Sequence, residues 1–238
     1  MADSFTYPGA ELVLFQHAKN WKKYFSRQIK PLIKGNVLEV GAGIGATTLL
    51  LNDGTASKWL LLEPDEQMTA ILKNKINDNS LPANSVLQAG TIDQVSETFD
   101  TIIYIDVLEH IENDTAELEK AAALLNPGGH IIVLSPAFQF LYSPFDKAIG
   151  HYRRYSKRML RKITAPSLKI INNRYYDSLG YFAALANKLF LRQQYPTVKQ
   201  VLFWDRWLIP LSRFFDNLFF HQFGKAIIIT WQKADNIN

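Results

Sequence analysis

Short apolar runs alternate with helical segments along the first 136 residues of the chain. Runs of this kind, bounded by polar or turn residues, predict buried strands of a parallel sheet. They lie at residues 37–40, 59–62, 86–93 (together with the loop that follows the strand), 99–106 and 130–136. Over residues 115–125 apolar side chains recur at helical spacing, and Asn126-Pro127-Gly128-Gly129 should end that helix. This alternation predicts an open α/β sheet.

The last third of the chain extends this pattern. Residues 167–176 and 224–231 predict a sixth and a seventh strand. The intervening residues are rich in aromatic side chains and predict two helices, at 179–191 and from 198 to about 220. Pro196 should separate the helices, and Pro210 should kink or divide the second one.

A glycine-rich turn follows the first strand, in the sequence V-L-E-V-G-A-G-I-G. Gly41, Gly43 and Gly45 let the backbone turn sharply, so that a ligand reaches backbone N–H groups at the start of the next helix. The dinucleotide motif G-x-G-x-x-G places its third glycine one residue later. Glu39, two residues before the first glycine, suits a cationic ligand better than a pyrophosphate.

Polar residues follow the other strands at the positions where a sheet of this kind holds its ligand. Glu63 ends the second strand, where a carboxylate can bind a ribose diol, although a solvated turn carboxylate is the alternative. The run D-V-L-E-H-I, which begins at Asp106, follows the fourth strand. The segment L-N-P-G-G-H-I-I-V leads into the fifth.

These motifs, in this order over residues 36–136, resemble those of the class I S-adenosylmethionine (SAM) methyltransferases. The resemblance implies an α/β, Rossmann-like doubly wound sheet of seven strands, six parallel and the last antiparallel, with a helical insertion before the last strand. It implies SAM as cofactor and S-adenosyl-L-homocysteine (SAH) as product. The implied cofactor-binding residues are Tyr24, Glu39, Gly41, Gly43, Gly45, Glu63, Pro64, Met68, Thr91, Ile92, Asp106 and Val107. The family often has an acidic residue where Thr91 stands, so backbone groups of Thr91 and Ile92 are expected to contact the adenine.

A single domain is expected over residues 1–238. Its parts are an N-terminal helical lid (1–34), a Rossmann-like core (35–178), a helical aromatic-rich insertion or cap (179–223) and the final strand (224–238). The insertion could extend the core, cover the acceptor pocket, or present aromatic and basic residues to a membrane surface or to a second subunit of a homodimer. We favour a lid that is partly merged with the core.

Candidate acceptor-side residues lie in two loops. His110, after the fourth strand, and His151, after the fifth, are candidate general bases if the acceptor must lose a proton. The loop residues Tyr152, Arg153, Arg154 and Tyr155 are candidates for substrate binding, because an arginine fork suits a carboxylate or phosphate. The alternative is structural, with the arginine stacked on tyrosine and paired to a carboxylate such as Asp146.

A narrower resemblance covers nearly the whole chain. The G-H-Y-R-R-Y loop and the later F-W-D-R-W-L-I-P-L-S-R segment are similar to a bacterial subgroup of class I methyltransferases found beside glycosyltransferases. We therefore expect SN2 methyl transfer to a small-molecule or lipid- or glycan-linked acceptor, anionic and methylated on oxygen. The alternatives are N- or C-methylation, or a SAM-binding enzyme that catalyses a cyclisation or elimination.

Charge is distributed unevenly. Residues 1–150 carry 11 Lys+Arg and 18 Asp+Glu, whereas residues 151–238 carry 15 and 4, so the second part is strongly basic. The sequence has no cysteine, no run that could cross a bilayer, no secretory signal and no evident set of metal ligands, so we expect a cytoplasmic or membrane-peripheral protein without a metal. No nucleic-acid-binding module is recognisable, and nucleic acid is not an expected partner.

Overall fold

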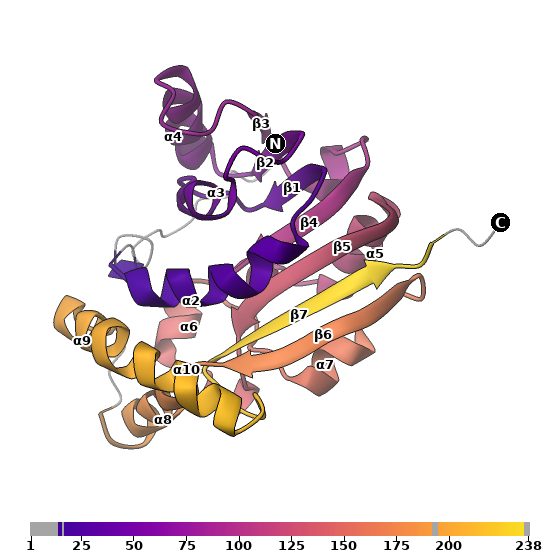
Figure 1. The fold of residues 1–238 in the computed structure, drawn as a ribbon. Coiled ribbons are helices and arrows are strands. Elements are labelled where there is room, and N and C mark those ends of the chain that lie inside the picture. The colour runs from indigo at the N-terminus through magenta and orange to yellow at the C-terminus, as the bar shows by residue number, and fades with distance from the viewer. Residues whose placement is uncertain (1–13, 16, 192–194, 236–238) are drawn as a thin grey trace.

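The computed structural model describes residues 14–15, 17–191 and 195–235, and its centre is one seven-stranded sheet (Figure 1). The strand order is β3-β2-β1-β4-β5-β7-β6. Neighbouring pairs are parallel except those that involve β7, which runs antiparallel to both β5 and β6. This confirms the predicted fold. The strands are β1 Asn36–Val40, β2 Lys58–Glu63, β3 Ser85–Ala89, β4 Phe99–Ile105, β5 Leu125–Pro136, β6 Leu168–Tyr176 and β7 Ala226–Lys233.

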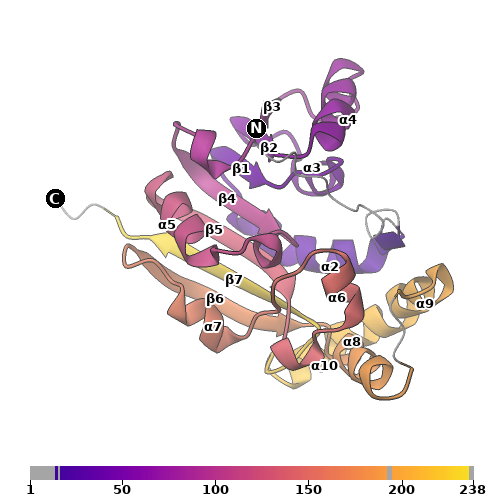
Figure 2. The same cartoon turned by 180° about the vertical axis from the view of Figure 1, so that it is seen from behind.

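Helices cover both faces of the sheet, because the inner strands are apolar on both sides. Helices α5 (Asp114–Ala123) and α7 (Lys157–Lys162) lie on the face seen in Figure 2. Helices α2 (Lys19–Ile29), α3 (Ala46–Leu51) and α4 (Glu66–Asn77) lie on the opposite face. Alternate side chains of one strand divide between the two cores: Leu38 packs toward α5 and Val37 toward α2.

Strand β5 begins earlier than expected. Residues Asn126 to Gly129 lie within β5 and do not form a loop after the helix, and α5 already ends at Ala123. The early start is possible because Leu125 pairs with Phe99 across an irregularity in the β4–β5 register. The Asn126 side-chain amide also donates a hydrogen bond to Asp100 Oδ1, at 3.0 Å.

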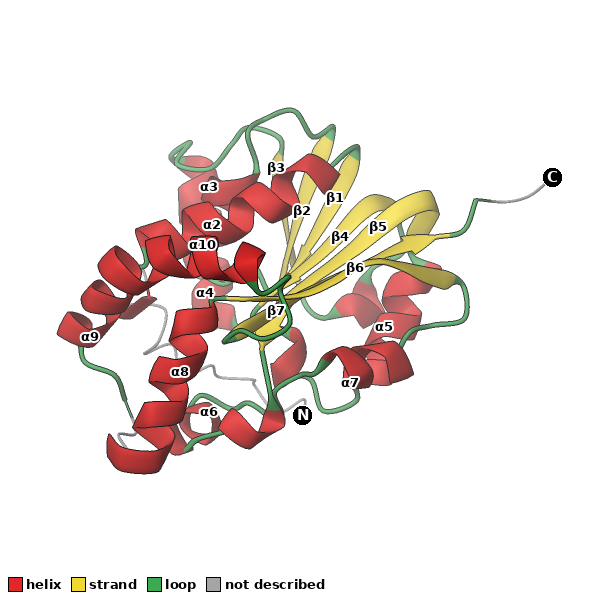
Figure 3. Cartoon of the chain, turned by 60° about the horizontal axis from the view of Figure 1, so that its bottom comes forward, coloured by secondary structure: helices red, strands yellow, loops and turns green. Residues whose placement is uncertain are grey.

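The insertion is helical, as predicted, and gathers beyond the carboxyl ends of the parallel strands (Figure 3). Helix α8 (Ser178–Ala186) continues as a π-helical turn, Asn187–Leu191. Helix α9 (Val198–Phe203) and helix α10 (Ile209–Leu218) are joined by a second π-helical turn, Trp204–Leu208. Pro210 therefore stands in the first turn of α10, where its missing N–H is tolerated, and the wide turn before it replaces the expected kink.

Buried carboxylates fasten the insertion to the core. Asp216 of α10 accepts hydrogen bonds from the backbone N–H groups of Asp177 and Ser178, both at 2.8 Å. Asp177 in turn accepts hydrogen bonds from the Trp204 indole and the Ser212 hydroxyl, both at 2.8 Å. Buried charges are stable only with such partners, so this end of the sheet and the insertion form one connected unit. The described chain also contains four short 3₁₀-helices and one short α-helix: η1 Lys30–Leu32, η2 Ile92–Gln94, η3 Leu108–His110, η4 Gln139–Leu141 and α6 Pro144–Ala148.

Candidate active site

A cavity of about 1170 Å³ opens at the carboxyl ends of β1, β2 and β4. In the sheet β1 lies between β2 and β4, and the connections after β1 and β4 lead to opposite faces. Such a switch point leaves a crevice between neighbouring loops, and ligands of open α/β sheets bind there. The cavity extends from the glycine turn past β4 to α2 and the insertion.

The glycine turn lines one side of this cavity. Gly41, Gly43 and Gly45 all have positive φ, between 56° and 77°, which favours glycine. A Cβ atom on Gly41 would lie 2.7 Å from Val107 Cγ2, whereas one on Gly43 would meet only Met68 Sδ, at 3.9 Å. Gly41 is therefore needed for packing, and Gly43 keeps the backbone open toward the cavity. Gly45 begins α3 and does not line the cavity.

Glu63 connects the end of β2 to the glycine turn. Its Oε2 accepts a hydrogen bond from the Gly43 backbone N–H at 2.7 Å, and its Oε1 accepts one from the Asp65 N–H at 3.0 Å. Burial raises the pKa of this carboxyl group. The side chain lines the cavity together with Pro64 and Met68. The expected ribose position is thus adjacent to the backbone of the turn.

The loop after β3 forms the next part of the wall. Thr91, Ile92 and Asp93 all line the cavity. The Thr91 backbone N–H is already donated to Gln94 Oε1, at 2.6 Å, within a capping box. Asp93 pairs with Lys120 at 2.5 Å. The Thr91 N–H is therefore not free to contact an adenine, and the expected backbone contact falls to other groups of this loop.

Asp106 and Val107 lie at the end of β4, opposite the glycine turn, and both line the cavity. Asp106 has φ 55°, a strained conformation for a residue other than glycine. The residue is open to the cavity, and the surrounding protein desolvates its carboxyl group and so raises the pKa to about 6. Glu39, by contrast, is buried behind the cavity wall, where its Oε2 accepts hydrogen bonds from Trp59 and Thr48. It supports the turn and does not line the cavity.

Both candidate bases line the same cavity and lie close together. The His110 and His151 rings meet edge to face, with centroids 4.6 Å apart. His151 Nδ1 is 2.9 Å from Asp146 Oδ1, and its Nε2 is 3.8 Å from Glu109 Oε1. Burial and the neighbouring His151 lower the pKa of His110 to about 3, so the ring is neutral near pH 7.

The aromatic–arginine loop has mainly structural contacts. Arg154 donates from Nε and Nη2 to the two oxygens of Asp146, at 2.8 and 2.9 Å, which is the structural alternative considered above. Arg153 pairs with Asp114 at 2.6 Å, and the fully buried Tyr155 donates its hydroxyl to the same carboxylate. Of the four residues, Arg154 alone lines the cavity, within the described part of the chain. These pairings favour the structural alternative for both arginines. The arginine fork stays a prediction for Arg154, whose Nη1 has no hydrogen-bond partner among the described residues.

The N-terminal helix contributes different residues from the one expected. Tyr24 does not line the cavity, because its hydroxyl donates to Asp216 Oδ2 at 2.9 Å on the other side of α2. Trp21 and Phe25 of the same helix do line it. Trp21 was among the N-terminal aromatic residues expected to fold across the cofactor. Tyr7, another aromatic residue of that segment, lies outside the described residues. Cavity residues that sequence reasoning missed are Phe25, Glu109, Asp177, Trp204 and Lys225. Glu109 stood within the D-V-L-E-H-I motif, but the others carry no local signal.

Comparison with known proteins agrees with this geometry. Residues 38–131, which include the glycine turn, Glu63 and the whole segment from Asp106 to His110, match the model of a methyltransferase domain. No curated protein matches the sequence.

Solved structures with this fold share little sequence with the chain. A chain from the complex between the Haloferax volcanii Trm112 methyltransferase activator and a methyltransferase has a TM-score of 0.65 and 13% identity, covering 95% of both chains. The [4+2]-cyclase SpnF has a TM-score of 0.63 and 15% identity over 93% of this chain and 83% of its own. A SAM-dependent methyltransferase from Clostridium acetobutylicum has a TM-score of 0.58 and 12% identity over 91% and 92%. Residues 38–131 thus match a methyltransferase domain, and the whole chain shares the fold of solved SAM-dependent methyltransferases.

Proposed function

We propose that this protein transfers the methyl group of SAM to an oxygen atom of an anionic small-molecule, or lipid- or glycan-linked, acceptor. The observation that carries the proposal is the continuity of one cavity from Glu63 and Gly43 past Asp106 to His110 and His151. SAM would occupy the first part, with its sulfonium methyl directed at the second. An acceptor oxygen held about 3 Å from that methyl carbon is positioned for in-line attack.

The size of the cavity supports two ligands. Pockets for one drug-sized ligand measure about 300–1,000 Å³, and this cavity, as bounded by the described residues, measures about 1170 Å³. Its acceptor side is walled by the aromatic rings of Trp21, Phe25, Phe203 and Trp204. Such a wall excludes water from the transfer and suits an acceptor with an apolar portion.

Lys225 supports an anionic acceptor, now that both arginines have protein partners. It lines the cavity at the start of the last strand, with its ammonium 4.2 Å from the centroid of the Trp204 ring. Within the described residues it forms no ion pair with a carboxylate. Burial lowers its pKa, as expected for a cation that is not fully compensated by the protein. A carboxylate or phosphate of the acceptor would supply that compensation.

Calorimetric titration of SAM and SAH into the purified protein tests the cofactor half of the proposal. We expect micromolar affinity for both, reduced at least tenfold in Glu63→Ala and unchanged in Glu66→Ala, which removes an exposed carboxylate nearby. A folded protein that binds neither compound would overturn the proposal. Acceptor screening then follows with anionic metabolites and lipid-linked sugars, with SAH formation as the readout.

A second candidate function keeps the cofactor and changes the chemistry. The fold similarity to a protein named as a cyclase favours considering a SAM-binding enzyme that does not transfer the methyl group. The two functions differ in their products. Conversion of an acceptor without release of SAH would favour the second, and one SAH per product molecule would favour methylation.

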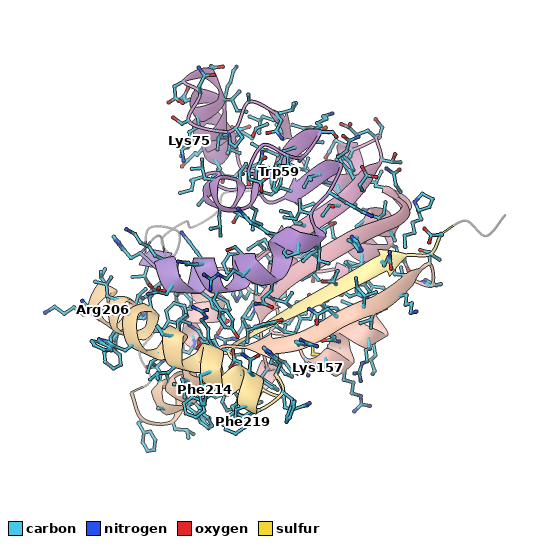
Figure 4. All side chains as sticks on the ribbon, in the orientation of Figure 1. Trp59, Lys75, Lys157, Arg206, Phe214 and Phe219 are labelled. Carbon is cyan, nitrogen blue, oxygen red and sulfur yellow. The ribbon has the colours of Figure 1, made fainter. Side chains whose placement is uncertain are left out.

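The outer surface of the insertion suggests how a lipid-linked acceptor would be reached. Apolar side chains project along one stripe of α9, α10 and the turn between them. Each of these residues is 52–66% exposed. They are Phe203, which also borders the cavity, Trp207, Leu211, Phe214 and Leu218. Arg206 and Arg213 lie on the same helical segment, and Figure 4 shows Arg206 and Phe214 pointing outward. No helix in the described residues is long and apolar enough to cross a bilayer. We propose that this stripe rests on an anionic lipid surface.

A further inference from the structure

Three side chains with metal-binding atoms converge on the acceptor side of the cavity. Glu109 and His110 belong to η3, which follows β4, and His151 comes from the separate loop after α6. One ligand atom from each lies within 4.8 Å of the other two. All three residues line the cavity. The fold, and not local spacing, therefore brings two imidazoles and a carboxylate together.

Glu109 has an unexplained oxygen at this place. Its side chain is 0% exposed, and its Oε2 accepts a hydrogen bond from the Ser135 hydroxyl at 2.8 Å. Its Oε1 has no hydrogen-bond partner among the described residues. His151 Nε2 lies 3.8 Å from this oxygen, which is too far for a hydrogen bond. A buried carboxylate oxygen without a partner is costly, and a cation between Glu109 and His151 would remove that cost.

The imidazole of His151 is held in the orientation that a metal ligand requires. Asp146 accepts a hydrogen bond from Nδ1, and Arg154 and Ser143 fix Asp146 in turn. With the proton on Nδ1, the Nε2 lone pair faces Glu109. A carboxylate that orients a histidine through its second nitrogen is the usual support of a metal-bound imidazole. The backbone carbonyl of Gly150 accepts a hydrogen bond from the His110 ring.

We propose that Glu109, His110 and His151 bind a divalent transition-metal ion, such as Mn²⁺ or Zn²⁺, with its open coordination positions facing the cavity. Two histidines and one carboxylate with open positions are typical of catalytic rather than structural metal sites. Imidazole ligands favour Zn²⁺ over Ca²⁺. The two histidines predicted as bases are then ligands.

The role of the metal rests on the proposed methyl transfer. An acceptor hydroxyl bound to the metal would have a lowered pKa and would release its proton to solvent. The resulting oxygen anion would form a bond to the methyl carbon while the carbon–sulfur bond breaks, and the electron pair of that bond would stay on sulfur as the uncharged thioether of SAH. Lys225, on the same side of the cavity, would bind an anionic group of the acceptor. The acceptor class is therefore a hydroxyl compound with a nearby carboxylate or phosphate.

Metal binding is measured on chelator-treated full-length protein without SAM or acceptor. We titrate Co²⁺ and follow its visible absorption bands, and then determine bound Zn²⁺ and Mn²⁺ by elemental mass spectrometry after dialysis. We expect one equivalent, with affinity lowered at least tenfold in Glu109→Gln and His151→Ala. His130→Ala is the matched control, because His130 is a partly buried histidine outside the cavity. The inference is overturned if the elemental assay finds less than about 0.1 equivalent of metal on folded wild-type protein. It is also overturned if the variants bind as much metal as the wild type.

Two further measurements keep the outcome unambiguous. If the variants fail to fold, histidine-selective NMR of the wild type decides: Zn²⁺ must shift the ring signals of two of the five histidines, and any other pattern counts against the site. Calorimetry with SAM on the same preparation separates the two proposals. Protein that binds SAM but no metal overturns the metal site alone, whereas protein that binds metal but neither SAM nor SAH overturns the proposed function alone.

Discussion

The carboxylate of Asp205 caps the helix that contains Trp21, although the two residues come from opposite ends of the chain. Its oxygens accept the backbone N–H groups of Asn20 and Trp21 at 3.0 and 2.8 Å. Ala18, at the N-cap position of α2, offers no side-chain hydrogen bond. The insertion thus supplies the cap that the local sequence lacks, and it holds Trp21 against the cavity.

Replacing this cap should loosen α2. We expect Asp205→Ala to lower the free energy of unfolding by about 1–2 kcal/mol, because two N–H groups lose a charged acceptor at the helix N-terminus. Affinity for SAM should also fall, since Trp21 and Phe25 line the cavity. Urea unfolding and calorimetry measure the two effects. Glu119→Ala, which removes an exposed carboxylate of α5, is the control and should change neither.

Two glycines with positive φ offer a matched comparison. Gly43→Ala and Gly54→Ala should each destabilise the protein by roughly 1–2 kcal/mol, because both residues are left-handed and neither would suffer a close contact. Only Gly43 lines the cavity. We therefore expect SAM affinity to fall at least tenfold in Gly43→Ala and to stay constant in Gly54→Ala. Equal affinities would place SAM elsewhere.

Glu39 should make stability depend on pH. Burial raises the pKa of its carboxyl group from 4.5 to about 7, so the folded protein binds this proton more tightly than the unfolded chain. The stabilisation of the folded protein by this bound proton is fully present below pH 4.5 and is lost as the pH rises to about 7. The free energy of unfolding changes by an amount on the order of 3 kcal/mol over this range. Glu39→Gln keeps an oxygen for Trp59 and Thr48 but cannot ionise. Its stability relative to wild type should rise from pH 4.5 to 7 and then level off in urea titrations; parallel curves would contradict the assignment.

Lys225 should lower stability in the absence of an acceptor. Its ammonium is buried near the Trp204 ring without an ion pair in the described residues. We expect Lys225→Met to raise the free energy of unfolding at pH 7 by about 1 kcal/mol, because an apolar chain of similar length removes a costly charge. Because the folded pKa is lowered, wild-type stability rises with pH above that pKa and the advantage of the variant shrinks. A loss of stability in the variant would show that the charge is compensated.

The apolar stripe of α9 and α10 should bind anionic lipid. We expect the protein to float with vesicles that contain one-third phosphatidylglycerol and to stay behind with pure phosphatidylcholine. Trp207→Ser with Phe214→Ser should abolish flotation without changing SAM affinity, because both side chains are exposed outside the cavity wall. A concentration-dependent dimer that the double variant dissolves, with no flotation, would assign the stripe to a second copy of the chain.

Much of the cofactor side could be predicted from sequence because its signals are local. Gly41 and Gly43 must be glycines for backbone reasons within one turn, and Glu63 follows directly from the end of a strand. The order of apolar runs also predicted the sheet, since parallel strands need helical crossovers between them. The start of β5 was wrong by several residues, because the pairing of Leu125 with Phe99 outweighs the turn tendency of the following Pro and Gly.

The acceptor side could not be read in the same way. Arg153 and Arg154 look alike in the sequence, and only the folded chain shows that Asp114 and Asp146 occupy them. Likewise, Tyr24 was expected at the cofactor. The orientation of α2 in the fold places Tyr24 beside Asp216, whereas Trp21 of the same helix lines the cavity. Lys225 carries no motif at all.

The sequence by itself determined the strand order along the chain, the glycine turn and the acidic residues that follow β2 and β4. These depend on backbone geometry and on spacing within a few residues. Only the tertiary structure decided which charges are neutralised, which aromatic rings enclose the cavity, and that Glu109, His110 and His151 meet. Such properties arise from contacts between distant segments, whose free energies depend on burial and partner distance rather than on neighbours in the sequence.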